Sequence, residues 1–96
     1  RDMRSMLLFD RAIVRRELGD ALAANEDLDQ ALELFSGVGF FESNARLLEQ
    51  QSVKARDLGF DAAACWIDLR TYELYRENGD RAGAEDLLSI MDDFGC

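Results

Sequence analysis

Histidine and proline are both absent from this chain of 96 residues. Histidine is the side chain that most often ligates metals and most often transfers protons near neutral pH. Without it, a cysteine or serine nucleophile has no imidazole base, and no glycine-rich phosphate loop follows a strand pattern. We therefore expect no catalytic activity, no bound metal and no cofactor.

Cysteine occurs only twice, which is too few for the disulfide framework of a small secreted domain. Cys65 stands in an apolar run, so we expect a small buried side chain there, and we expect Cys96 to be a free thiol. No apolar run is long enough to cross a bilayer, and Arg1 opens the chain without a signal-peptide pattern. These features predict a cytoplasmic protein without membrane contact. The start at Arg1 also predicts that the chain is a fragment of a larger protein.

The formal net charge of −9 arises from 20 acidic and 11 basic side chains. The first twenty residues are slightly basic, residues 21–45 carry acidic charges alone, and residues 71–96 are strongly acidic. An acidic field repels nucleic acid and anionic membranes, so we expect no direct contact with either. The charge favours a basic partner, or it simply keeps the domain soluble.

Glycine recurs at a constant spacing, at positions 19, 39, 59 and 79. Glycine readily adopts the left-handed conformation that ends helices, and the segments between these glycines are rich in helix-forming residues. The spacing predicts helices over 2–17, 21–36, 41–57, 61–77 and 81–94, and no segment alternates like a strand. Because such short connections make neighbouring helices antiparallel, we predict an all-α fold of about five antiparallel helices.

Apolar residues recur at helical spacing within these segments, one stripe to a helix. The stripes comprise Met3, Met6, Phe9 and Ile13; Ala24, Leu28, Ala31 and Phe35; Phe41, Ala45, Leu48, Ser52 and Ala55; and Ala84, Leu87, Leu88, Met91 and Phe94. The fourth segment is apolar on more than one side, which predicts a place in the middle of the stack. Asp20, Asp61 and Asp80 stand where helix N-caps belong.

Two segments carry a family resemblance. Gly19-Asp20-(x3)-Ala24-(x3)-Leu28-(x2)-Ala31 and Gly79-Asp80-(x3)-Ala84-(x3)-Leu88-(x2)-Met91 both resemble the turn and second helix of the tetratricopeptide family. The whole chain is similar to the degenerate tetratricopeptide-like repeats of large bacterial transcription regulators. The resemblance implies one domain over residues 1–96, folded as an α-solenoid with a 20-residue period per helix. It also implies a cytoplasmic regulator whose helical repeats receive a signal or hold a partner.

Three arginines are candidates for binding an anion. Arg4, Arg11 and Arg15 share one face of the first helix and could clamp an acidic or phosphorylated ligand. The alternatives are a solvated face, or ion pairs with acids of the second helix such as Asp29 and Glu33.

Polar and aromatic side chains of the later helices are further candidates. Asn44 could hold the backbone of a bound peptide, or it could cap its own helix. Trp66, Tyr72 and Tyr75 are amphipathic anchors of the kind enriched in binding hot spots, although helical spacing also suits them to a core. A cluster of acids lacks the loop spacing of a calcium site, and we interpret it as a solvated helix face: Glu26, Asp27 and Asp29.

We predict a non-catalytic module that binds a protein or peptide partner in a groove lined by the first, third and fifth helices. Two alternatives stay open at this point. One is a regulatory domain that senses a small molecule in an apolar pocket near Trp66 and Tyr72. The other is a self-assembling segment of a longer solenoid, in which the basic first helix of one copy meets the acidic last helix of another.

Overall fold

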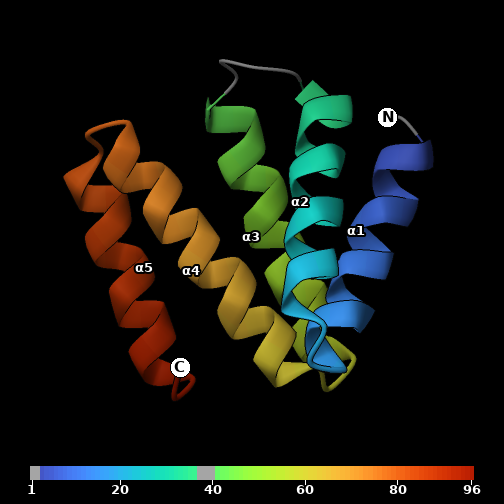
Figure 1. The fold of residues 1–96 in the computed structure, drawn as a ribbon. Helices are drawn as coiled ribbons and strands as arrows, with labels where there is room; N and C mark the ends of the chain where they lie inside the picture. The colour runs from blue at the N-terminus through green and yellow to red at the C-terminus, as the bar shows by residue number, and fades with distance from the viewer. Residues whose placement is uncertain (1–2, 37–40) are drawn as a thin grey trace.

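The computed structural model describes residues 3–36 and 41–96, and these residues form five α-helices. The helices are α1 (Met3–Glu17), α2 (Ala21–Ser36), α3 (Phe41–Asp57), α4 (Asp61–Glu77) and α5 (Arg81–Asp93), shown in Figure 1. No strand occurs in the two described stretches. The predicted all-α class is confirmed, and each predicted helix agrees with the observed one to within a residue at either end.

The helices are arranged around α4, which crosses the middle of the molecule between α3 and α5 (Figure 1). The most extensive contacts join α1 to α2, α3 to α4 and α4 to α5, and smaller contacts join α1 to α4 and α2 to α3. Helix α4 therefore packs against three others, as its apolar residues on more than one side predict. Helix α5 lies at the edge and packs mainly on α4. The solenoid arrangement with a tetratricopeptide-like period stays a prediction.

Helices α1, α3, α4 and α5 all end in the same hydrogen-bonded turn, which is built on a glycine with positive φ. At Gly79, φ is +73°, the Gly79 nitrogen lies 3.1 Å from the Arg76 oxygen, and the Asp80 nitrogen lies 2.9 Å from the Tyr75 oxygen. These two bonds satisfy carbonyl groups that the helix end leaves open. The same pattern recurs at Gly19, Gly59 and Gly95. The predicted glycine ends are thus confirmed at 19, 59 and 79, whereas position 39 lies outside the described residues.

Two of the three predicted N-caps are confirmed. The Asp80 carboxylate accepts a hydrogen bond from the Gly83 N–H at 2.9 Å, and the Asp20 carboxylate accepts one from the Ala23 N–H at 3.4 Å. The prediction for Asp61 is wrong, because Asp61 is the first residue of α4 and the cap position belongs to the residue before it. Its charge still suits the positive end of the α4 dipole.

The core combines bulky apolar side chains with alanines that let helices approach closely. Its members with at most 2% of their surface exposed are Phe9, Ala12, Ala24, Leu28, Ala31, Ala45, Leu48, Ala55, Ala63, Ala64, Ile67 and Leu87. The first turn of α5 lies very close to α4, because a Cβ on Gly83 would lie 2.6 Å from Cδ1 of Tyr75. Only glycine fits at that position without a shift of the ring.

Some residues of the predicted apolar stripes are exposed, and these lie at the edges of the molecule. Leu88 is 49% exposed and Phe94 is 60% exposed, because α5 has a neighbouring helix on one side only. Met3, in the first turn of α1, is 80% exposed. The side chain of Phe41 lies outside the described part of the structure.

Cys65 and Cys96 form a disulfide bond, with their Cα atoms 5.5 Å apart. The predictions of a small buried apolar residue at Cys65 and a free thiol at Cys96 are therefore wrong. The reason is tertiary: α5 runs antiparallel to α4, so the segment that follows α5 returns to the first half of α4. The bond closes a loop between residues separated by 31 positions.

Replacing Gly79 by alanine should lower the free energy of unfolding by about 1 kcal/mol, because an L side chain is strained in the left-handed region. A Cβ at this position meets no atom within 4 Å, so the loss would come from the backbone alone. Gly79→Asn should cost less, since asparagine tolerates positive φ. Urea unfolding of the two variants measures the difference, and equal losses would contradict the explanation.

Candidate functional site

A groove with a volume of about 620 Å³ lies between α3 and α5, with α4 as its floor. We call it the α3–α5 groove. Its lining residues are Glu49, Ser52, Val53, Arg56 and Asp57 of α3, Asp68 and Tyr75 of α4, and Gly83, Asp86, Leu87, Ile90 and Phe94 of α5 and the turn after it. Helix α1, which the sequence analysis placed in the binding groove, contributes no residue to it.

The groove is apolar inside and acidic at its edges. Its apolar surface comes from Val53, Leu87, Ile90 and Phe94, and all but Leu87 are largely exposed. Four carboxylate residues share the lining with a single basic residue: Glu49, Asp57, Asp68, Asp86 and the basic Arg56. Apolar contact combined with excess negative charge suits an occupant that is itself apolar on one side and positively charged on the other.

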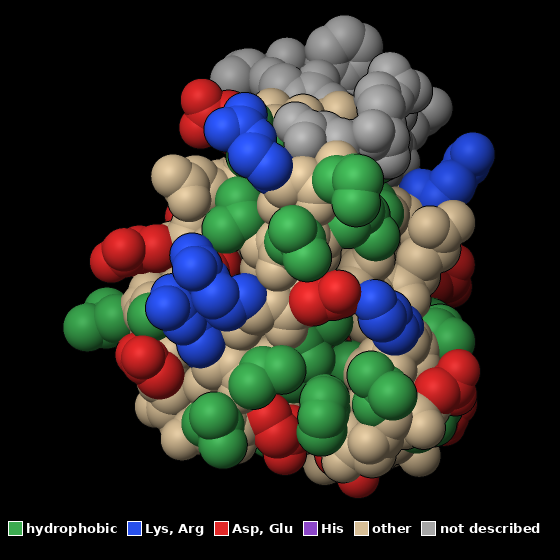
Figure 2. All heavy atoms as spheres, turned by 90° about the vertical axis from the view of Figure 1, so that its right-hand side faces the viewer, with side chains coloured by type: hydrophobic (Ala, Val, Ile, Leu, Met, Phe, Trp, Pro, Cys, Tyr) green, Lys and Arg blue, Asp and Glu red, His purple; other side chains and the backbone are tan. Residues whose placement is uncertain are grey.

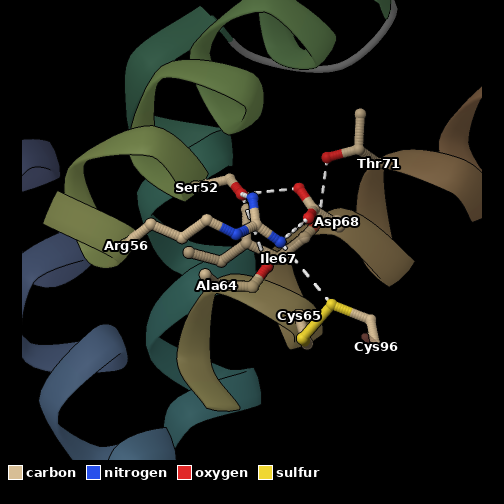
Figure 3. A network of polar contacts seen from close by, with 8 residues as sticks. All are labelled: Ser52, Arg56, Ala64, Cys65, Ile67, Asp68, Thr71 and Cys96. Carbon is tan, nitrogen blue, oxygen red and sulfur yellow. Dashed lines mark hydrogen bonds and ion pairs between the residues drawn. A yellow bond between two sulfur atoms is a disulfide. The ribbon is translucent and has the colours of Figure 1, made fainter. Parts of the chain in front are cut away.

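A polar network joins α3 to α4 (Figure 3), and its members Ser52, Arg56 and Asp68 also line the groove. Asp68 is 3% exposed, and its carboxylate accepts hydrogen bonds at 2.5 Å from Nη2 of Arg56 and from Oγ of Ser52. The guanidinium also stacks 3.9 Å from the ring centroid of Phe94 and lies 3.5 Å from Sγ of Cys96. One arginine of α3 therefore contacts α4 and the segment that follows α5.

The floor of the groove carries Tyr75, one of the predicted anchors. Its hydroxyl donates a hydrogen bond to Oε1 of Glu49 at 2.8 Å. Burial, followed by the hydrogen bond and negative charge of Glu49, raises the pKa of Tyr75 to about 12. The phenol stays neutral at physiological pH and links α4 to α3 across the groove.

The other predicted aromatic residues lie elsewhere. Trp66 is 8% exposed, and its indole N–H donates to Oδ1 of Asn25 on α2 at 3.0 Å. Tyr72 lines a separate hollow of about 370 Å³, where Arg76 lies 5.8 Å above its ring. Among the described residues, the hollow beside Tyr72 does not include Trp66. Asn44 is half-buried near the start of α3, and it does not line the α3–α5 groove.

The arginines of α1 are largely engaged within the protein. Arg11 makes a bidentate pair with Asp27, with both contacts at 2.9 Å, and Arg15 binds the same carboxylate at 3.0 Å. Asp27 is 3% exposed, so its assignment to a solvated face is wrong. The predicted partner Asp29 instead pairs with Arg70 of α4.

The electrostatics of Asp27 follow from this pairing. The hydrogen bond from Arg11 is the largest cause that lowers the pKa of Asp27, and the charges of Arg11 and Arg15 add to it against the opposing effect of burial. The same hydrogen bond raises the pKa of Arg11. The pair therefore stays ionised at neutral pH and fixes α1 on α2.

Arg4 lies beside a second, smaller hollow of about 270 Å³ between α1 and α2, lined also by Leu7, Leu8, Gln30 and Leu34. Figure 2 shows the side of the molecule on which α1 lies. Apolar side chains are spread over this face with charged side chains between them. The apolar surface on this face is thus interrupted by charged side chains.

Neither a membrane span nor a metal cluster occurs within the described stretches. No helix there is long and apolar enough to cross a membrane. No group of three or more cysteine, aspartate or glutamate residues comes together there in a way that could hold a metal ion.

A scan against protein-family models and searches of curated proteins and solved structures found no match to this chain. The geometry of the groove is therefore what supports a function.

Replacing Asp27 by asparagine should destabilise the protein at pH 7, because it removes the charge that holds Arg11 and Arg15. The folded-state pKa of Asp27 lies below its ordinary value of 3.8, so its stabilising effect is present above that value and is lost as the pH falls through the folded pKa. The difference in free energy of unfolding between the wild-type protein and Asp27→Asn, measured by urea unfolding, should shrink on acidification below about pH 4. Asp29→Asn is the matched control: its side chain is 66% exposed, so the effect should be several times smaller.

Proposed function

We propose that this chain is a non-catalytic binding module that holds a basic, amphipathic segment of a partner protein in the α3–α5 groove. The observation that carries the proposal is the combination of exposed apolar side chains with several carboxylates on the two helices that flank α4. Lone exposed apolar side chains are ordinary on protein surfaces, but a contiguous apolar groove edged by polar groups is typical of an interaction site.

A helical segment fits this groove best. Helices α3 and α5 lie on either side of α4, which leaves a trough of the kind that receives the apolar face of an amphipathic helix. Apolar side chains of the partner would contact Val53 and Ile90, while its lysine or arginine side chains would reach Asp57 and Asp86 at the edges. Burial of the apolar contacts supplies affinity, and the charges select the partner and speed its approach.

We also propose that the five helices are a tetratricopeptide-like stack that serves as the scaffold or signal-receiving part of a regulatory protein. Two features support this proposal. The glycines recur every 20 residues, and the described glycine turns share one hydrogen-bonding pattern. Helical stacks of this kind present extended surfaces to partners.

A small apolar effector is the second candidate, and the groove volume favours it. A volume of about 620 Å³ lies within the range of small-molecule sites. Such a ligand would depend on the apolar wall and not on the carboxylates at the edge. The two candidates therefore differ in their response to charge.

Charge reversal at the edge of the groove should weaken binding of a labelled probe peptide of about 18 residues, with leucines at helical spacing and lysines elsewhere. We expect the double variant Asp57→Lys/Asp86→Lys to raise the dissociation constant about tenfold, measured by fluorescence anisotropy. Binding to the wild-type protein should weaken with added salt.

Glu85→Lys is the matched control for Asp86→Lys alone, because each reverses one charge and the two residues are adjacent, but Glu85 lines the separate hollow beside Tyr72. It should leave the affinity nearly unchanged. The peptide proposal would be refuted if a probe with glutamates in place of lysines bound as tightly as the lysine probe. It would also be refuted if Glu85→Lys weakened binding as much as the replacements in the groove do. An apolar effector that binds wild-type protein and Asp57→Lys/Asp86→Lys equally well would favour the small-molecule candidate.

A further inference from the structure

Helix α5 is held unevenly along its length. Its first half packs closely on α4 through Gly83, Ala84 and Leu87, and the latter two are its buried residues. Its second half carries Ile90 and is followed by Phe94, and these residues are 39% and 60% exposed. The interactions that hold this second half are therefore few, although it supplies one wall of the α3–α5 groove.

Three contacts fix the segment that follows α5. The Cys65–Cys96 disulfide ties it to the first half of α4, and the guanidinium of Arg56 stacks on Phe94 and donates to Sγ of Cys96. Arg56 keeps its bond to Asp68 whatever α5 does, because Asp68 lies on α4. The disulfide is the one covalent constraint on this wall of the groove.

The disulfide lies where a reductant can reach it. Cys96 is exposed and Cys65 is partly exposed, so the bond lies at the surface and not in the core. We propose that the Cys65–Cys96 bond is a reversible reduction site that controls the α3–α5 groove. In the oxidised protein the groove is formed; in the reduced protein the second half of α5 separates from α4. The effect on a bound peptide rests on the proposed function, whereas the release of α5 does not.

The chemistry is thiol–disulfide exchange with a dithiol as the reductant. A thiolate of the dithiol attacks one sulfur, the S–S bond breaks, and a mixed disulfide forms as one protein thiolate departs. The second thiol of the reductant displaces the other protein sulfur, which leaves two protein thiols and a cyclic disulfide. The protein gains two electrons and two protons. The guanidinium of Arg56, 3.5 Å from Sγ of Cys96, would stabilise a thiolate at that position.

A disulfide that only strengthened the fold would act differently. Loss of a cross-link destabilises the whole protein through the entropy of the unfolded chain, without singling out one helix of the native state. The uneven packing of α5 predicts a local effect instead, in which residues 88–94 lose protection from amide exchange while residues 81–87 and α1–α4 keep theirs.

The experiment compares the oxidised chain, the chain reduced with excess dithiothreitol, and Cys96→Ser, which lacks the bond without any reductant. Amide hydrogen exchange followed by mass spectrometry reports α5, and anisotropy of the lysine–leucine probe peptide reports the groove. We expect amide exchange to accelerate at least tenfold in residues 88–94 alone and the probe affinity to fall about tenfold, both on reduction and in Cys96→Ser. Dithiothreitol should change nothing further in Cys96→Ser.

The outcomes separate the two proposals. Unchanged exchange in α5, or acceleration spread equally over all helices, would overturn the reduction site. Faster amide exchange in α5 with unchanged probe affinity would overturn the proposal that the disulfide controls the α3–α5 groove. A probe that binds neither form while α5 responds to reduction would overturn the peptide-binding function and support the reductive release of α5.

Discussion

The ion pair between Arg56 and Asp68 is the interaction on which the rest of the structure depends. A carboxylate that is 3% exposed is costly to bury unless its charge and its lone pairs are satisfied. Arg56 and Ser52 of α3 meet that requirement, so the register of α3 against α4 is set by a polar constraint as well as by apolar packing. Because α4 contacts α1, α3 and α5, this register positions the other helices too. The same guanidinium reaches Phe94, which extends the constraint to the far wall of the groove.

The pair of helices α1 and α2 also buries an aspartate, Asp27, and satisfies its charge with side chains of the preceding helix. Asp27 is bound by side chains 16 and 12 residues earlier, and Asp68 is bound by side chains at the same two separations. The two aspartates are nevertheless not equivalent in the glycine repeat, because Asp27 is eight positions after Gly19 and Asp68 is nine after Gly59. Each hairpin therefore places its aspartate against the preceding helix independently of the exact period. This shared spacing is the signal in the sequence that could have identified Ser52, Arg56 and Asp68.

Local signals were sufficient to predict the helices and insufficient to predict the groove. Helix ends follow from glycines such as Gly79 and caps such as Asp80, whose effects lie within a few residues, and these predictions are confirmed. The burial of Asp27 and the pairing of Cys65 with Cys96 depend on which helices become neighbours, which periodicity alone does not encode. The same limit explains Trp66 and Tyr75. Both were predicted as anchors or core residues. Trp66 belongs to the core, where its indole N–H binds Asn25 on α2, whereas Tyr75 lies in the floor of the α3–α5 groove.

Helix α5 is a wall of the groove, and it has the fewest buried residues of the five helices, counted over the residues whose burial the structure describes. An occupant that covers Ile90 and Phe94 would supply apolar contacts that the chain itself does not make. Binding and docking of α5 are then thermodynamically linked: an occupant that prefers docked α5 stabilises it, and whatever docks α5 raises the affinity for the occupant. On the proposed function, a covalent bond after this helix would act on the same equilibrium, since it would remove the undocked states that compete with binding. The position of the disulfide would then matter more for the groove than its general contribution to the stability of the fold.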